Sequence, residues 1–321
     1  MIDKTLKFPT DNLISNRDGL GEALVDAGKI NPNIVVVCAD LAESVKVHTF
    51  AQTFPQRFIE VGVAEQNAVT IASGMAAVGK IPFVASYAVF SPGRNWEQIR
   101  TTICYNDQPV KIIGSHAGLA SGPDGATHQA LEDIALMRVL PNMTVISPCD
   151  YFEAKKATIA SINQSSPVYI RLCREKTPVI TTPDTPFEIS RASIFRTGSD
   201  VTICATGPII YEALLASETL ALEEISVEII NVSTIKPIDE ETILNSVRKT
   251  GRVITLEDHQ IIGGLGSAVT ELVSGSFPVP VMRLGVNDQF GQSGKYRKLL
   301  REYEMDAQAV IDAVKIIINK S

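Results

Sequence analysis

Residues 57–87, RFIEVGVAEQNAVTIASGMAAVGKIPFVASY, decide the fold because they contain a strand, a helix and a second strand in succession. The two ends, 57–62 and 81–87, are rich in β-branched and aromatic residues, which strands favour. The middle, 64–79, carries small and apolar residues at helical spacing. A helix that connects two apolar strands is typical of a parallel sheet.

The same alternation continues along most of the chain. Further strands are predicted at 34–40, 110–116, 144–149, 168–173, 201–207, 227–233, 253–258 and 279–285. Helices are predicted at 150–164, 209–224 and 263–273, with one after Asp239 and two at the end of the chain. Near-continuous apolar strands separated by helices predict an α/β fold with mainly parallel sheets flanked by helices.

One segment, 174–190, interrupts the alternation. It is rich in proline and threonine, which favour turns and loops, and we interpret it as an interdomain linker. The sequence therefore predicts two domains, residues 1–185 and residues 191–321, each with its own sheet.

Composition excludes several classes of function. The net charge is −7, from 29 basic and 36 acidic residues, so the chain lacks the excess of basic residues that is typical of proteins that bind nucleic acid. Five scattered cysteines form no metal-binding or disulfide pattern. The first residues lack an apolar signal core and no run of 18 apolar residues occurs, so we expect a cytoplasmic protein without a membrane segment.

In parallel sheets, ligands bind where the strands end, so the residues after each strand are candidates for a site. Asp40 and Ser44 follow the first strand, although helix capping also explains them. Tyr87 ends the strand at 81–87 and Phe90 follows it, where core packing is the alternative. Arg174 follows the strand at 168–173 and suits either a surface position or a phosphate clamp.

Glu65 begins the helix at 64–79. The helix dipole alone favours a carboxylate in a first turn. The small and apolar residues from Val63 to Ala76, however, predict a helix that is buried on most sides. A buried carboxyl group needs a partner and can exchange a proton with it, so Glu65 is a candidate catalytic residue.

A glycine-rich loop, SHAGLASGPDGATHQALED (115–133), follows the strand at 110–116. It carries His116, Asp124 and His128, and thus two of the four histidines in the chain. A loop that only connected two elements would not need them, which favours a functional role.

These motifs together resemble a known family. SNRDGLGEAL (15–24), ADLAES (39–44), GVAEQNAV (62–69), the 115–129 loop, VYIRLCRE (168–175) and LEDHQIIGGLGSAVTE (256–271) occur in the order found in the C-terminal half of transketolase. The chain resembles this half over nearly its whole length, as a pyrimidine-binding domain followed by the transketolase C-terminal domain.

The resemblance implies roles around thiamine diphosphate. Glu65 matches the glutamate that hydrogen-bonds the pyrimidine N1′, Phe90 the aromatic residue that stacks on that ring, Tyr87 a second aromatic of the pocket, and Asp40 an aspartate beside the cofactor. The family's third pocket aromatic falls on Gly93, and Trp96 is a candidate substitute.

The resemblance also implies substrate contacts. Arg17, Ser44 and Arg174 match positions that hold the sugar phosphate. His116 and His128 match histidines near the substrate's hydroxyl groups and phosphate, with catalytic roles, and Asp124 matches an aspartate that binds a substrate hydroxyl.

A partner is also implied. Full-length members carry an N-terminal domain whose GDG…N motif binds Mg²⁺ and the diphosphate, and this chain has no GDG. We therefore expect a separate N-terminal subunit that holds most of the Mg²⁺ contacts, and an α2β2 heterotetramer. The expected activity is ketol transfer between phosphorylated sugars, as in the pentose phosphate pathway.

Other functions share this architecture. Half of a 1-deoxy-D-xylulose-5-phosphate synthase is one alternative, although the lead EDHQ at 257–260 is unusual there. The beta subunit of a 2-oxo acid dehydrogenase is another, although DGATHQ at 124–129 favours a sugar. An inactive paralogue that acts as a scaffold would not need Glu65, His116, Asp124, His128 and Arg174 together.

Overall fold

The strand–helix–strand unit at residues 57–87 lies inside a seven-stranded sheet. Six strands of this sheet are parallel and the edge strand β12 is antiparallel to β6. The order across the sheet is β12 (Thr234–Lys236), β6 (Thr144–Ile146), β7 (Val168–Arg171), β5 (Lys111–Ser115), β4 (Ile81–Tyr87), β2 (Ile34–Cys38) and β3 (Phe58–Glu60). The computed structural model describes residues 1–319.

Helices cover both faces of this sheet because successive side chains of each strand point to opposite faces. Val84 of β4 packs in a cluster with α3, η2 and α5, whereas its neighbours Phe83 and Ala85 pack in a cluster with α1, α2 and α6. The helices of this domain are α1 (Asn16–Ile30), α2 (His48–Thr53), η1 (Pro55–Arg57), α3 (Glu65–Ala77), α4 (Trp96–Gln98), η2 (Ile99–Cys104), η3 (Leu119–Asp124), α5 (Asp133–Arg138) and α6 (Tyr151–Ile162).

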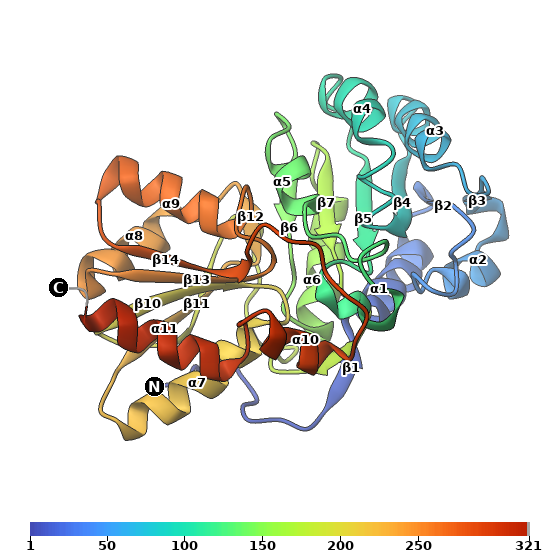
Figure 1. Ribbon diagram of the computed structural model, residues 1–321. Helices are drawn as coiled ribbons and strands as arrows, with labels where there is room; N and C mark the ends of the chain where they lie inside the picture. The colour runs from blue at the N-terminus through green and yellow to red at the C-terminus, as the bar shows by residue number, and fades with distance from the viewer. Residues whose placement is uncertain (320–321) are drawn as a thin grey trace.

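A second sheet of five strands lies beside the first (Figure 1). Its order is β14 (Val281–Val286), β13 (Val253–Gln260), β10 (Val201–Thr206), β11 (Val227–Asn231) and β9 (Ser193–Arg196), with β9 antiparallel. Its helices are α7 (Ile210–Leu222), α8 (Glu240–Thr250), α9 (Leu265–Ser276), α10 (Tyr296–Glu302) and α11 (Ala307–Asn319). The prediction of an α/β fold with mainly parallel sheets flanked by helices is confirmed.

Several segments cross between the two sheets. The short strand β12, which follows β11 in the chain, pairs with β6 of the first sheet. At the other end of the chain, Ile2 forms a bridge with Arg196 of β9. The expected linker contains β8 (Lys176–Pro178), which pairs with β1 (Leu13–Ser15). The limits 1–185 and 191–321 stay a prediction, since these segments join the two units.

The expectation that the helix at 64–79 is buried on most sides is wrong. In α3, Ala68, Val69 and Ala72 are buried against the sheet, but Gln66, Asn67, Thr70 and Gly74 are exposed, and Val63 just before it is 69% exposed. Small residues pack equally well inside a protein or on its surface, so their presence alone did not distinguish the two. Glu65 itself is buried, with 3% exposure.

The five cysteines are free and buried. Within residues 1–319, the helices all fall short of the length and apolar character that a bilayer crossing requires.

A buried charged network joins the first sheet to the second domain. Arg171, at the end of β7, donates from Nε to Asp133 at 2.8 Å and from Nη2 to the carbonyl of Asp258 at 2.8 Å. The Asp258 carboxylate accepts the backbone N–H groups of Leu119 at 2.8 Å and Ala120 at 3.4 Å. The glycine-rich loop is thus held by the end of β13.

A second buried contact lies between α6 and β11. Glu153 accepts the amide N–H of Cys149 at 2.6 Å and the side-chain N–H of Asn231 at 2.6 Å. Burial raises the pKa of Glu153 to about 7. The side-chain oxygen of Asn231, Oδ1, is also buried, and it has no hydrogen-bond partner within residues 1–319. A protonated Glu153, or a glutamine, would donate to Oδ1 if the Asn231 amide turned over.

We predict that Asp258→Ala destabilises the protein by about 2–4 kcal/mol, because two buried N–H groups lose their acceptor. Denaturant unfolding measures this loss, and hydrogen exchange should quicken most at 117–130. Asp312→Ala on the exposed side of α11 serves as the control. Unchanged exchange in the loop would show that Asp258 does not hold it.

We predict that Glu153→Gln raises Tm more at pH 8.5 than at pH 5.5. Burial raises the pKa of the Glu153 carboxyl to about 7 in the folded protein, above its value in the unfolded chain. The stability that this carboxyl contributes is therefore fully present below the pKa of the unfolded state, and it is lost as the pH rises through 7. The difference between the two pH values is about 2 kcal/mol, which corresponds to several degrees of Tm. A Tm difference that does not change with pH contradicts the prediction.

Candidate functional site

The candidate residues gather at the carboxyl edge of the first sheet, because parallel strands end on the same side. Tyr87 is the last residue of β4, His116 directly follows β5 and Arg174 lies three residues after β7. Glu65 begins α3, which follows β3.

Four of the predicted residues form one aromatic cluster. The rings of Tyr87 and His116 stack with centroids 3.8 Å apart, and Phe90 lies 5.8 Å from Tyr87 in a near-parallel orientation. His128 meets Phe90 edge-on at 5.5 Å. Segments far apart in the sequence, after β4 and in the glycine-rich loop, therefore contribute to one surface.

His116 is a buried neutral imidazole. Burial, with smaller contributions from the charges of Arg17 and Arg174, lowers the pKa of His116 to about 3. Its Nδ1 lies 2.8 Å from the hydroxyl of Ser115. Near neutral pH it can therefore donate or accept a hydrogen bond without carrying charge.

Glu65 is connected to this cluster through Arg94, whose guanidinium also lies over the Phe90 ring, and it has several polar partners. Arg94 Nη1 is 3.2 Å from Oε2 and 3.5 Å from Oε1, and the Ser86 hydroxyl is 3.5 Å from Oε1. Asn95 donates to the backbone carbonyl of Glu65 at 3.0 Å. The partner that a buried carboxyl group requires is thus Arg94, which the sequence analysis did not select. The only signal was its position four residues after Phe90.

Arg17 connects several loops of the edge. Its Nε donates to the Ser15 hydroxyl at 3.1 Å, and its two terminal nitrogens donate to the backbone carbonyls of Ser44 and Arg174. Nη1 also lies 3.5 Å from His116 Nε2. Each of the three nitrogens has a protein acceptor, which fixes the guanidinium in place, and Nη2 carries a second N–H that a phosphate could accept.

Arg174 reaches the glycine-rich loop. Its Nε lies 3.8 Å from Asp124 and its Nη1 lies 3.6 Å from Glu175. Both members of the Arg174–Asp124 pair are about one-third exposed, so a ligand at this edge could contact either side chain. The structure therefore brings these two predicted substrate contacts together.

Two expected residues lie apart from the cluster. Asp40 is exposed, in a left-handed conformation with φ 57°, and its amide donates to Glu60 at 2.7 Å. Trp96 donates to the carbonyl of Leu136 at 2.8 Å and packs in the hydrophobic core between α3 and the sheet. The idea that Trp96 substitutes for the third pocket aromatic is therefore wrong, because its ring is used in the core.

The GGLGSA segment (263–268) is a tight strand-to-helix turn between β13 and α9. Gly263 has φ 80° and Gly264 is the N-cap of α9. Glu257 accepts the N–H groups of Leu265 at 2.6 Å and Gly266 at 2.7 Å, so a buried carboxylate occupies the helix N-terminus.

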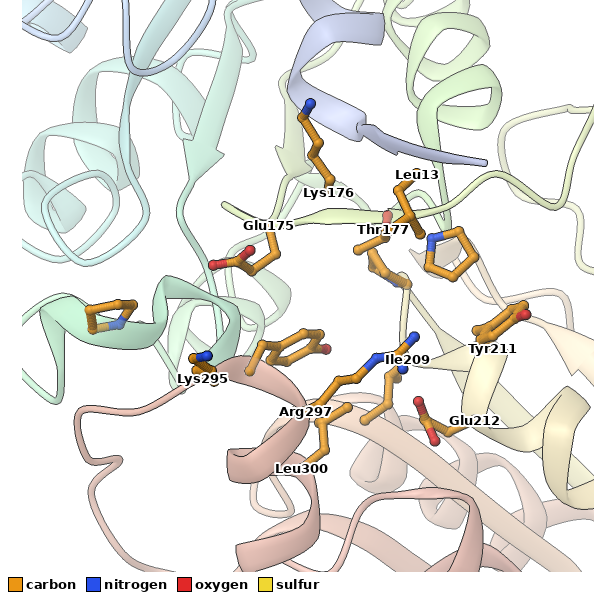
Figure 2. Close-up of a pocket in the computed structure, with 14 residues that line it drawn as sticks. Leu13, Glu175, Lys176, Thr177, Ile209, Tyr211, Glu212, Lys295, Arg297 and Leu300 are labelled. Carbon is orange, nitrogen blue, oxygen red and sulfur yellow. The ribbon is translucent and has the colours of Figure 1, made fainter. Parts of the chain in front are cut away.

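A separate cavity of about 440 Å³ lies between β8 and the helices α7 and α10 (Figure 2). Lys176, Glu212 and Arg297 are among the side chains on its walls. None of the ten predicted site residues lines it, so the sheet edge and not this cavity is the candidate site. Within residues 1–319, no cluster of three or more histidine, cysteine or carboxylate side chains could hold a metal ion.

Comparisons with known proteins agree with this arrangement. Residues 12–179 match the model of the transketolase pyrimidine-binding domain, and residues 190–310 match the transketolase C-terminal domain. A putative transketolase C-terminal section from Methanocaldococcus jannaschii is 46% identical over 92% of this chain and 93% of its own length.

Two further matches cover nearly the whole chain. A subunit of the apulose-4-phosphate transketolase from Phocaeicola vulgatus is 35% identical over 97% of this chain and 99% of its own length. A solved split-gene transketolase, described as an inactive beta4 tetramer, is 45% identical with a TM-score of 0.89, over 95% of this chain and 99% of its own. The chain therefore belongs to the transketolase family, among the C-terminal subunits of its split members.

Proposed function

We propose that this chain is the C-terminal subunit of a heteromeric, thiamine diphosphate-dependent transketolase that transfers a two-carbon ketol unit between phosphorylated ketose and aldose sugars. The observation that carries the proposal is the buried carboxylate of Glu65, which Arg94 links to the Phe90 ring of the aromatic cluster. Relatives that are named as transketolase subunits support it.

The residues present fit the aminopyrimidine ring of the cofactor. A planar ring with a nitrogen edge needs one buried hydrogen-bonding carboxyl and one aromatic face, and Glu65 and Phe90 supply these. The diphosphate needs Mg²⁺, and the described residues contain no cluster of ligands for it. This chain is therefore suited to bind the aminopyrimidine ring of the cofactor rather than its diphosphate.

Glu65 would hold and exchange a proton at ring N1′, and such general acid–base catalysis contributes about 10²–10⁴-fold. When bound, the cofactor supplies the carbon nucleophile and stabilises the carbanion. Phe90 would orient the ring. His116, which is neutral, and His128 would exchange protons with the sugar hydroxyl groups, and Arg174 with Asp124 would fix the position of the phosphorylated sugar.

The partner would be an N-terminal subunit that carries the diphosphate- and Mg²⁺-binding motif, in an α2β2 assembly. Relatives named as subunits support this, since each implies a second chain. The similar structure described as an inactive beta4 tetramer supports the view that such a C-terminal subunit alone is insufficient.

The sugar is the least constrained part of the proposal. One relative, 40% identical, is a 6-deoxy-6-sulfo-D-fructose transketolase subunit from a Clostridium species, and another acts with apulose 4-phosphate according to its name. A sulfonate and a phosphate are both tetrahedral anions that an arginine can bind. The edge around Arg174 would suit either.

We predict that the purified chain alone has no ketol-transfer activity. Addition of its N-terminal partner with thiamine diphosphate and Mg²⁺ should restore transfer from xylulose 5-phosphate to ribose 5-phosphate. A panel with 6-deoxy-6-sulfo-D-fructose and pyruvate tests the other substrates. Activity of the chain alone contradicts the split-subunit proposal, and use of pyruvate as donor favours the synthase or dehydrogenase alternatives.

We predict that Glu65→Gln lowers kcat by about 10²–10⁴-fold in the assembled enzyme while Tm changes little, because the amide cannot exchange the proton. Steady-state kinetics and thermal unfolding measure the two effects. Glu97→Gln, on an exposed carboxylate of α4, is the matched control and should retain full activity. A near-wild-type rate for Glu65→Gln removes Glu65 from this role.

A further inference from the structure

The loop after β4 contacts the first residue of α3 at several points. The side chain of Asn95 is fully buried and donates to the carbonyl of Glu65 at 3.0 Å and to the Ser91 hydroxyl at 3.1 Å. The backbone N–H of Arg94 donates to the carbonyl of Phe90 at 2.8 Å. This turn brings the side chain of Arg94 against both the Phe90 ring and the Glu65 carboxylate.

Arg94 contacts the two ring-binding residues at once. Its Nη1 is 3.2 Å from Oε2 of Glu65, and its Cζ lies 4.1 Å from the centre of the Phe90 ring. Arg94 is 50% exposed, whereas the Glu65 carboxylate is 3% exposed. The guanidinium therefore lies between solvent and a buried carboxylate and covers one face of the phenyl ring.

An arginine is suited to this double contact. Its guanidinium is planar, so its edge can donate to a carboxylate while its face stacks on an aromatic ring. Lysine carries the same charge but neither the plane nor the fork of donors. The pair of contacts fixes both the distance and the orientation between the Glu65 carboxylate and the Phe90 ring.

The two oxygens of Glu65 are held unequally. Oε2 has the shorter contact with Arg94, at 3.2 Å, whereas Oε1 has only two contacts of 3.5 Å, from Arg94 and Ser86. Oε1 is therefore the more available acceptor for a ring nitrogen. The Phe90 ring is held between neighbours, with Arg94 over one face and Tyr87 near-parallel at 5.8 Å.

We propose that Arg94 is a positioning residue for the ring of the cofactor: it holds Oε2 of Glu65 and one face of Phe90, and so fixes the carboxylate and the phenyl ring relative to each other and leaves Oε1 available to a planar aminopyrimidine. The inference rests on the proposed function, since it assigns a further residue to the same site. Arg94 acts through Glu65 and Phe90 and does not itself take part in the chemistry.

The test is the Kd of thiamine diphosphate in the assembled enzyme, measured by isothermal titration calorimetry with Mg²⁺ present. Arg94→Met retains an apolar side chain over Phe90 but lacks the charge, and should raise Kd about tenfold or more. Arg94→Lys should give an intermediate Kd. Arg100→Met, on an exposed arginine of η2, is the matched control and should leave Kd unchanged.

A double-mutant cycle separates positioning from a general structural role. If Arg94 acts through Glu65, then Arg94→Met should raise Kd much less in a Glu65→Gln background than in the wild type. A loss of equal size in both backgrounds would overturn the inference, as would a Kd for Arg94→Met that equals or falls below the wild-type value. The KM for the sugar should stay the same in Arg94→Met, because Arg94 does not contact the Arg174 and Asp124 pair.

The failures of the two proposals are distinguishable. If the wild-type assembly does not bind thiamine diphosphate, the proposed function fails and the assignment of Arg94 fails with it. If the wild type binds and Arg94→Met binds equally well, only the assignment of Arg94 fails.

Discussion

The buried guanidinium of Arg171 is the contact on which the rest of the site depends. It joins Asp133 of the first domain to the carbonyl of Asp258 in the second, and the Asp258 carboxylate in turn accepts the first amides of η3. The loop from 115 to 133 is glycine-rich and would lose much conformational entropy on ordering. His116 and His128 both lie on this loop. The rings of the aromatic cluster therefore keep their positions only while the contacts between the two domains hold the loop in place.

Three consecutive residues of β13 explain the EDHQ motif physically. Glu257 accepts the first amides of α9, Asp258 accepts those of η3, and His259 Nε2 accepts the amide of Ala135 at 3.4 Å. Burial lowers the pKa of His259 to about 4, so its imidazole is neutral and its Nδ1 donates to the carbonyl of Gln260 at 2.7 Å. The motif by which the family was recognised therefore also supplies two contacts between the domains, through Asp258 and His259.

Much of this could be predicted from the sequence, and the exceptions have common physical causes. Long apolar strands such as β4 were predicted at their exact residues, because their periodicity is local. Strand β12 was not predicted, since three residues have no periodicity and their partner, β6, lies about ninety positions away. At the site, the residues directly after strands were found, but Arg94 was not, because only the turn after Phe90 brings it to Glu65. Trp96 was misassigned for a different reason, since an aromatic residue has no local signal that separates a core position from a pocket position.

The charges at the sheet edge explain why a single chain would carry only the ring half of the cofactor site. Each arginine there faces a protein acceptor: Arg17 the carbonyls of Ser44 and Arg174, Arg94 the carboxylate of Glu65, and Arg174 the carboxylate of Asp124. His116 is neutral. A diphosphate carries several negative charges and would need cations without such partners or a metal ion. An uncharged ring needs only a face and a hydrogen-bonding edge, and those are what this edge of the sheet supplies. In the proposed assembly, the division of the cofactor between two chains would follow from this division of charge.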